Sequence, residues 1–393
     1  MKSKKKPELL APAGNFKSLA AAIKAGADAV YFGLKDFNMR DSAQNFRIKD
    51  LKEINKMCGK NIKKYLTLNT IIYNNELLQI EKVIKQVKGK VDAIICWDIS
   101  VINLCKKYKI PFFISTQASV SNKEAAKFYK KLGASRIILA RELNLNQIKQ
   151  ISKILPVEIF IHGAMCVAES GRCFTSQFLH CKSANRGQCQ HPCRKTYKII
   201  DDEGNELKLE NHNVMSAKDL CTLPFFEKIK KSGAISFKIE GRGREPEYVY
   251  TITKIYRKAL DNKFSKKEIA NSMEELKQVY NRDFSSGYFI KSPTPDDFTS
   301  SENGNAKKTK KYVGKVSHYW KEIGVAAIKV SAEIKQNDDL LIVGKNTYQE
   351  AKVKSMQINH KEIQKAEKGQ DVAIKLPLCR ENDEVYVRIS KNP

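Results

Sequence analysis

Over residues 7–241, short runs of β-branched and aromatic residues alternate with longer amphipathic stretches. Such runs are typical of buried parallel strands, and the stretches between them are typical of helices that cover a parallel sheet. The pattern predicts eight strands, over residues 7–13, 27–34, 64–71, 92–98, 111–117, 136–141, 157–163 and 235–241. Eight strands joined by helices favour a (β/α)8 TIM-like barrel over an open α/β sheet.

The amphipathic stretches carry apolar residues near positions i, i+3 and i+4, and several end in glycine, the usual residue just beyond a helix. They predict helices over residues 15–26, 48–59, 75–89, 99–109, 122–133, 144–155 and 245–262. One connection breaks the rhythm, because more than 70 residues separate the seventh predicted strand from the eighth. Long insertions after barrel strands lie at the C-terminal face, where barrel enzymes build their active sites.

The pattern changes in the last quarter of the chain. Residues 291–311 are polar and typical of a linker. Beyond them, alternating runs predict a small all-β barrel with strands over 312–320, 322–330, 338–344, 350–359, 370–376 and 384–389. The phrases "GKV", "DDLLIVG", "VKSM" and "AEKGQDVAI" resemble the second domain of translation elongation factors. We therefore expect a barrel domain over 1–290 with an insertion at about 163–234, the linker, and a β-barrel domain over 312–393.

Composition narrows the class of protein. Apolar residues make up 42% of the chain, and no window approaches the run of about 18 apolar residues that a membrane span needs. The basic N-terminus runs directly into a predicted strand, so we expect a cytoplasmic protein without a membrane partner. The formal charge of +28, from 71 Lys and Arg against 43 Asp and Glu, implies attraction to a polyanion such as RNA. A solvated, lysine-rich surface is the equally strong alternative.

Five of the ten cysteines fall within residues 158–197, at the start of the long insertion. Structural disulfides are rare in the cytoplasm, so clustered cysteines there are typical of metal or redox sites. Six, fifteen and three residues separate Cys166, Cys173, Cys189 and Cys193. Zinc sites usually pair ligands about two to four residues apart, which only the last pair does. An iron–sulfur cluster fits at least as well, because it is larger and its ligands approach from separate directions.

The remaining cysteines have simpler interpretations. A free cysteine on a predicted helix or strand is usually a small buried hydrophobe, and this covers Cys58, Cys96, Cys105 and Cys379. Cys181 lies inside the cysteine-rich segment but outside the spacing, and we interpret it as a spare thiol. Cys221 competes with Cys193 for the place of fourth ligand.

Polar residues stand at the predicted C-terminal ends of the strands, where the catalytic groups of barrel enzymes gather. They are Asn69, Asp98, Gln117, Arg141, His162, Glu240 and Arg242. We interpret Arg141 and Arg242 as candidates for binding a dicarboxylate, and His162 and Glu240 as candidates for proton transfer. Asn69 and Gln117 are candidates for substrate binding. Helix capping or mutual pairing is the alternative role for each.

The segment "EIFIHGAMCVAESGRCFTS" (158–176) is similar to the signature of the peptidase U32 family. The resemblance extends to residues 8–34, 115–122, 215–221, 236–249 and 281–289, and covers about 290 residues in order. The family was named for collagenase-like peptidases. Similar members include prephenate-dependent RNA hydroxylases, which make 5-hydroxyuridine at the tRNA wobble position or hydroxylate a ribosomal RNA cytidine. Related members bind a [4Fe–4S] cluster through four cysteines, and the resemblance places these on Cys166, Cys173, Cys189 and Cys193.

The resemblance implies an iron–sulfur enzyme that hydroxylates a pyrimidine base of tRNA or rRNA, above all the tRNA wobble uridine, with prephenate as co-substrate. A U32 peptidase is the alternative, although the sequence has no G-x-S-x-G elbow and no H-E-x-x-H motif. A third hypothesis is a non-catalytic RNA-binding or scaffold subunit paired with a second chain of this family. For RNA binding, the basic residues 307–311 and the aromatic side chains of Tyr319 and Trp320 are the candidates.

Overall fold

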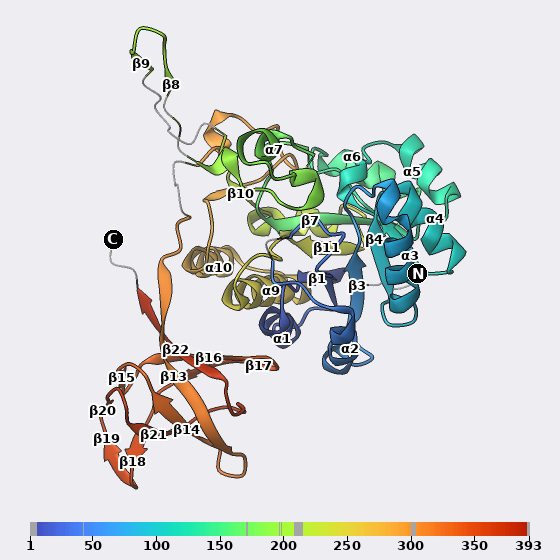
Figure 1. Ribbon diagram of the computed structural model, residues 1–393. Helices are drawn as coiled ribbons and strands as arrows, with labels where there is room; N and C mark the ends of the chain where they lie inside the picture. Colours follow the sequence, from blue (N-terminus) through green and yellow to red (C-terminus); the bar gives the residue numbers. More distant parts are fainter. Residues whose placement is uncertain are drawn as a thin grey trace.

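The computed structural model describes residues 6–41, 43–169, 172–195, 197, 199–207, 215–299 and 304–390. Eight parallel strands form a closed barrel (Figure 1). They are β1 (Glu8–Pro12), β2 (Ala29–Gly33), β3 (Lys63–Thr67), β4 (Ala93–Cys96), β5 (Phe112–Ile114), β6 (Arg136–Ile138), β7 (Val157–Gly163) and β11 (Ser236–Ile239). The barrel closes because β11 pairs in parallel with both β1 and β7. The eight predicted strands and the TIM-like barrel are confirmed.

Helices connect the strands and surround the barrel (Figure 1). They are α1 (Phe16–Lys24), α2 (Leu51–Cys58), α3 (Leu77–Val87), α4 (Ile99–Lys107), α5 (Lys123–Lys131), α6 (Leu145–Ile151), α8 (Phe226–Lys230), α9 (Pro246–Asp261) and α10 (Lys266–Gln278). Asn or Asp side chains accept hydrogen bonds from the first turns of α1, α4, α5 and α6 and so fix where these helices begin. The seven predicted helices are confirmed, and α8 and α10 are additional. Within the described part of the chain, every helix is too short or too polar to cross a membrane.

Charged side chains fill part of the barrel interior. Glu158 of β7 is fully buried and forms ion pairs of 2.9 Å with both Arg136 and Lys238. Arg136 also donates a hydrogen bond of 2.7 Å to Glu8. Each buried charge therefore has the partner that its removal from water requires. Lys238, at the top of this network, also lines a cavity at the C-terminal ends of the strands.

The insertion between β7 and β11 lies at the C-terminal ends of the strands (Figure 1). It contains α7 (Thr175–His180), the hairpin of β8 (Ile199–Ile200) and β9 (Glu206–Leu207), and β10 (Asp219–Cys221). β10 pairs antiparallel with β7, and β12 (Phe284–Ser285) pairs with β10. The sequence places the cysteine-rich segment over the mouth of the barrel, and the structure agrees. Its residues 170–171, 196, 198 and 208–214 lie outside the described part of the chain.

The C-terminal unit is an eight-stranded antiparallel sheet with the order β17-β16-β22-β13-β14-β21-β18-β19. Its strands are β13 (Lys308–Trp320), β14 (Val325–Val330), β16 (Asp339–Gly344), β17 (Thr347–Lys352), β18 (Met356–Ile358), β19 (Lys361–Ile363), β21 (Asp371–Lys375) and β22 (Glu384–Ser390), beside the short pair β15 (Ile334–Lys335) and β20 (Lys365–Ala366). The all-β prediction is confirmed. The strand predicted over 350–359 is divided between β17 and β18, because Val353 forms hydrogen bonds with the turn at Asn337 and Asp338.

The C-terminal sheet packs against α1 and α9 of the barrel. Tyr348 of β17 stacks on Tyr250 of α9 with 4.4 Å between ring centroids. Arg388 of β22 forms an ion pair of 2.7 Å with Glu247 of α9. Leu341, Val343 and Tyr348 belong to the same hydrophobic cluster as the helices around the barrel. β13 begins at Lys308, inside the predicted linker, whose residues 300–303 lie outside the described part.

Candidate functional site

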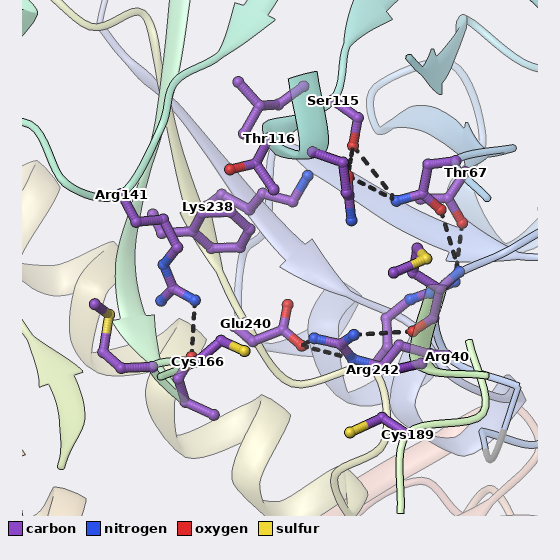
Figure 2. Close-up of a pocket in the computed structure, with 18 of the residues that line it drawn as sticks. Arg40, Thr67, Ser115, Thr116, Arg141, Cys166, Cys189, Lys238, Glu240 and Arg242 are labelled. Atoms are coloured by element: carbon purple, nitrogen blue, oxygen red, sulfur yellow. Dashed lines mark hydrogen bonds and ion pairs between the residues drawn. The ribbon is translucent and has the colours of Figure 1, made fainter. Parts of the chain in front are cut away.

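A cavity of about 140 Å³ opens at the C-terminal ends of the barrel strands (Figure 2). Side chains of β2, β3, β4, β6, β7 and β11 form its lower wall, and residues 164–166 and 184–194 of the insertion contribute to its upper wall. Its charged side chains are those of Arg40, Arg141, Arg194, Lys238, Glu240 and Arg242. Because cations outnumber anions in its wall, this cavity suits an anionic ligand.

Glu240 is the carboxylate of this cavity. Arg40 donates to one of its oxygens from Nη2 at 2.9 Å and from Nε at 3.2 Å, and Tyr31 Oη lies 3.2 Å from the other. Burial alone would raise the pKa of Glu240, but the charges of Arg40, Arg141 and Arg242 lower it to about 2. Glu240 is therefore ionised near neutral pH and accepts hydrogen bonds there, and so low a pKa makes it a poor base, against its predicted role in proton transfer.

Arg242 lies in a pocket that Gly33 makes possible. A Cβ atom on Gly33 would lie 2.3 Å from Arg242 Nη1, so only glycine leaves room for the guanidinium. Arg242 donates hydrogen bonds of 2.9 Å to Thr67 and 3.0 Å to Asn38. Burial and the charge of Arg40 lower the pKa of Arg242 to about 10, which leaves it charged at neutral pH. The hydrogen bond from Arg242 to Asn38 holds the loop after β2 against the site.

Arg141 is a guanidinium of the cavity with unused hydrogen-bond donors. Its Nη1 atom donates to the carbonyl of Ala164 at 2.8 Å, and the group lies over the ring of Phe160 at 4.6 Å. Its Nε and Nη2 atoms are buried and have no hydrogen-bond partner among the described residues. Burial lowers the pKa of Arg141. Buried unpaired donors of a charged group are costly, so these two atoms favour an anionic ligand in the cavity.

The remaining predicted strand-end residues divide between the cavity and helix capping. Asn69 and Gln117 both line the cavity, and Asn69 Nδ2 lies 3.4 Å from Gln117 Oε1. Asp98 instead accepts hydrogen bonds from the backbone of Ser100 at 2.9 Å and of Ile72 at 3.1 Å. Asp98 therefore caps α4 and has the structural role that was its alternative.

His162 lies apart from the other candidates. Ile161 is left without a partner in the pairing of β7 with β11, so His162 turns away from the side of the strand that carries Phe160. Only 1% of His162 is exposed, and its ring packs against those of Tyr256 and Phe284. Burial lowers the pKa of His162 to about 3. The structure places this residue as a neutral side chain in the core, not in the cavity.

This placement predicts acid sensitivity. An unfolded chain binds a proton on His162 below pH 6.5, whereas the folded protein does so only near pH 3. The contribution of neutral His162 to the free energy of unfolding is therefore fully present above pH 6.5. It is lost as the pH falls toward 3, by about 1.4 kcal/mol per pH unit for this one proton. Denaturant unfolding at pH 6 and pH 4.5 should show this loss in the wild type and not in His162→Gln. His360→Gln, at an exposed hairpin, is the control and should behave as the wild type.

Three of the predicted ligands, Cys166, Cys189 and Cys193, line the cavity together. Burial raises the pKa of the Cys193 thiol, the charge of Arg194 lowers it, and the nearby thiols of Cys166, Cys189 and Cys173 raise it further. All four sulfur atoms therefore lie in one neighbourhood. Each of the four is a free thiol that is exposed or partly exposed, whereas Cys58, Cys96, Cys105 and Cys379 are buried in the cores as expected.

Close packing of the backbone holds the cysteine loop in place. A Cβ atom on Gly187, whose φ is +89°, would lie 2.3 Å from the carbonyl oxygen of Asn38 in the loop after β2. Arg186 forms an ion pair with Glu76 and so ties the loop to the segment after β3. The backbone N–H of His191 donates to Cys189 Sγ at 3.4 Å, a type of contact that stabilises thiolate sulfur at metal centres.

The cysteine thiols suit a cluster better than a single metal ion. Among the residues that the structure describes, no three His, Cys, Asp or Glu side chains gather closely enough to hold a single metal ion. A four-iron cluster is larger, and its thiolates lie farther apart around it. Three free thiols at one cavity, a fourth nearby and several cations around them fit such a cluster in donor chemistry. Cys221 is buried against Tyr256 and Met273, and Cys181 ends α7 on the surface.

Sequence reasoning missed several cavity residues, namely Tyr31, Arg40, His191 and Lys238. Lys238 had a signal, because it is a charged residue in a predicted barrel strand and stands two positions before Glu240, on the same face. Arg40 follows β2 by seven residues in an irregular loop, and no periodic pattern points to it.

Comparisons with known proteins place this site in a family. The chain is 41% identical over 97% of its length to "Uncharacterized protease MJ0090" of Methanocaldococcus jannaschii, of which it covers 98%. It is 38% identical over 96% to "Collagenase" of Porphyromonas gingivalis, of which it covers 97%. It is 34% identical over 86% to "tRNA hydroxylation protein P1" of Bacillus subtilis, of which it covers 84%. Residues 14–298 match the model of the family described as "Peptidase family U32". The chain therefore belongs to this family.

Proposed function

We propose that the protein is an iron–sulfur enzyme that hydroxylates a pyrimidine base of RNA, with the wobble uridine of tRNA as its substrate and prephenate as its co-substrate. The observation that carries this proposal is one cavity in which Arg141 presents two unpaired buried donors beside three free thiols. The relative named for tRNA hydroxylation supports the reaction class. Two relatives are named as a protease and a collagenase, and the third is named for tRNA hydroxylation. These names support an enzymatic role for the chain.

Cys166, Cys173, Cys189 and Cys193 would hold a [4Fe–4S] cluster at the mouth of the barrel. Such a cluster supplies one-electron transfer when bound. The chain itself contributes the surroundings. Arg194 donates to the carbonyl of Met165 and to Ser216, and its charge lies close to Cys193. A cation so placed offsets the negative charge that four thiolates would gather there.

The cations of the cavity suit a dicarboxylate such as prephenate. Arg40 forms an ion pair with Glu240, and Lys238 forms one with Glu158. Arg242 donates hydrogen bonds to Thr67 and Asn38. Arg141 is the cavity cation with two nitrogen atoms, Nε and Nη2, that lack a hydrogen-bond partner among the described residues, so we assign one carboxylate of the co-substrate to it. Asn69 and Gln117 line the same cavity and are the proposed contacts of the base.

Aromatic side chains at the rim suit an RNA partner. Phe174 is 66% exposed and Phe178 of α7 is 84% exposed. Ser176 of α7 accepts a hydrogen bond of 3.0 Å from the backbone of Gln190, which ties the helix to the loop that lines the cavity. Exposed aromatic rings beside a cationic cavity stack with unpaired bases of single-stranded RNA loops.

Deletion of the gene tests the proposal. We expect 5-hydroxyuridine, or a nucleoside made from it, to disappear from tRNA when digested tRNA and rRNA are compared by mass spectrometry. Wild-type protein should restore the nucleoside, and Cys166→Ala should not. An unchanged nucleoside profile contradicts the proposal.

A peptidase is the second candidate, because two relatives carry protease or collagenase names. In the part of the chain that the structure describes, no hydrogen bond joins a serine or cysteine side chain to a histidine ring, the pairing that an activated nucleophile needs. Burial lowers the pKa of His191, the histidine of the cavity, to about 4. Cleavage of denatured collagen by iron-free protein, with RNA unchanged on deletion, would favour this candidate. Binding of RNA by the purified protein, together with an unchanged nucleoside profile after deletion, would favour a non-catalytic subunit that works with a second chain.

A further inference from the structure

A second cavity, of about 400 Å³, lies between the barrel and the C-terminal sheet. The start of α1, the loop between β2 and α2, and the turn between β16 and β17 surround it. Its lining residues include five cations, Lys17, Lys35, Arg47, Lys49 and Lys345. Asp50 is the acidic residue among them, and its carboxylate accepts a hydrogen bond of 2.7 Å from the backbone of Arg47. The cavity is therefore strongly cationic.

The cations differ in their partners. Lys17 pairs with Glu384, and Lys345 Nζ lies 4.6 Å from the centre of the Phe16 ring. Lys35 and Lys49 are exposed, and neither forms an ion pair with any residue that the structure describes. Unpaired lysines around a concave surface attract phosphate groups, and the N-terminus of α1 adds a partial positive charge from Asn15 onward.

A buried polar side chain, that of Asn45, belongs to the lining of the same cavity. Asn45 is 8% exposed, and its Oδ1 atom has no hydrogen-bond partner in the described part of the chain. Its Nδ2 atom donates to the carbonyl oxygens of Arg40 at 2.8 Å and Ala43 at 2.9 Å. An unpaired buried acceptor beside lysines favours a ligand that brings both a hydroxyl donor and a phosphate. A ribose phosphate carries both groups.

One loop separates the two cavities. Met39 and Arg40 line the cavity with the thiols, whereas residues 44–50 line the cationic cavity. Asn45 bonds to the backbone of Arg40, so the loop joins the two sites directly.

We propose that the cationic cavity binds a backbone phosphate and the adjoining ribose hydroxyl of the RNA whose base enters the first cavity. This inference rests on the proposed function and assigns a second contact to the same substrate. It also gives the C-terminal sheet a role, since Lys345 lies on the turn after β16.

The test is the affinity of the full-length, iron-replete protein for tRNA, measured over a range of salt concentrations. The variant Lys35→Ala/Lys49→Ala should bind tRNA roughly 10-fold more weakly and lower the slope of log K against log salt by about one to two. Lys345→Ala should weaken binding in the same direction. The matched control is Lys88→Ala/Lys90→Ala, two exposed lysines after the C-terminal end of α3, at the opposite end of the barrel. The control should bind as the wild type does.

The outcomes separate the two proposals. If the wild type binds no RNA, the proposed function fails and this inference fails with it. If the wild type binds tRNA but the Lys35 and Lys49 variant matches the control in affinity and slope, the inference alone is overturned. Titration with inorganic phosphate and with a 5′-mononucleotide distinguishes the source of the phosphate. A mononucleotide that binds through Lys35 and Lys49 without competing with tRNA would make this a small-molecule site and overturn the inference.

Discussion

Replacement of Cys166, Cys173, Cys189 or Cys193 with alanine is expected to remove the proposed [4Fe–4S] cluster and to abolish RNA hydroxylation. Three of these thiols line one cavity and the fourth lies near them, so each single loss leaves the cluster with three protein ligands. Anaerobic purification followed by iron and sulfide analysis measures the effect. The wild type should contain about four irons and four sulfides per chain, with the absorption spectrum of such a cluster.

Two further cysteines provide the controls. Cys181→Ala alters a surface thiol of the same segment and should keep its iron. Cys221→Ala tests the competing ligand; because Cys221 is buried against Tyr256 and Met273, we expect normal iron content and a lower melting temperature. Zinc as the only metal, or metal-free protein with unchanged variants, would contradict the cluster and return the peptidase to first place.

Replacement of Arg141 with methionine is expected to raise the KM for prephenate by roughly 10- to 100-fold, because hydrogen bonds to a charged group contribute about 1.5 to 3 kcal/mol. Methionine keeps a flexible apolar chain against Phe160 but removes the two free N–H donors. Initial rates of tRNA hydroxylation at several prephenate concentrations, on protein with full iron content, measure the effect.

Arg141→Lys distinguishes charge from geometry. Lysine retains the positive charge without the planar pair of donors, so its KM should lie between those of the wild type and the methionine variant. An unchanged KM for prephenate, with a loss of stability in both variants, would show that Arg141 serves only to hold the carbonyl of Ala164. In that case the anionic ligand would have to be assigned to another cation.

The barrel could be predicted because its strands are continuous apolar runs that only a fully covered parallel sheet accommodates. The position of the cysteines over its mouth followed from the length of one connection. By contrast, α10 is exposed or only partly buried along its length, and Leu276 is its buried residue, so its hydrophobic pattern is weak. The capping box of Ser265 and Glu268 is the sequence feature that indicates where α10 begins.

The candidate site was predicted in part. Asn69, Gln117, Arg141, Glu240 and Arg242 do line one cavity, because strand ends converge at one face of a barrel. His162 does not, since a bulge of a single residue reverses which side of the strand it occupies. Such a shift depends on hydrogen bonds with the neighbouring strand. The sequence of β7 alone therefore does not reveal it.

The closure of the barrel has a consequence for the order of folding. β11 completes the ring by pairing with β1 and β7, yet it follows the whole insertion in the chain. During synthesis, the segment with the four cysteines therefore leaves the ribosome before the strand that closes the barrel. Joining such distant strands costs loop entropy before any pairing is gained, which slows folding more than it lowers stability. Until β11 arrives, contacts such as those of Gly187 with Asn38 and of Arg186 with Glu76 can already position the cysteine loop on the unfinished barrel.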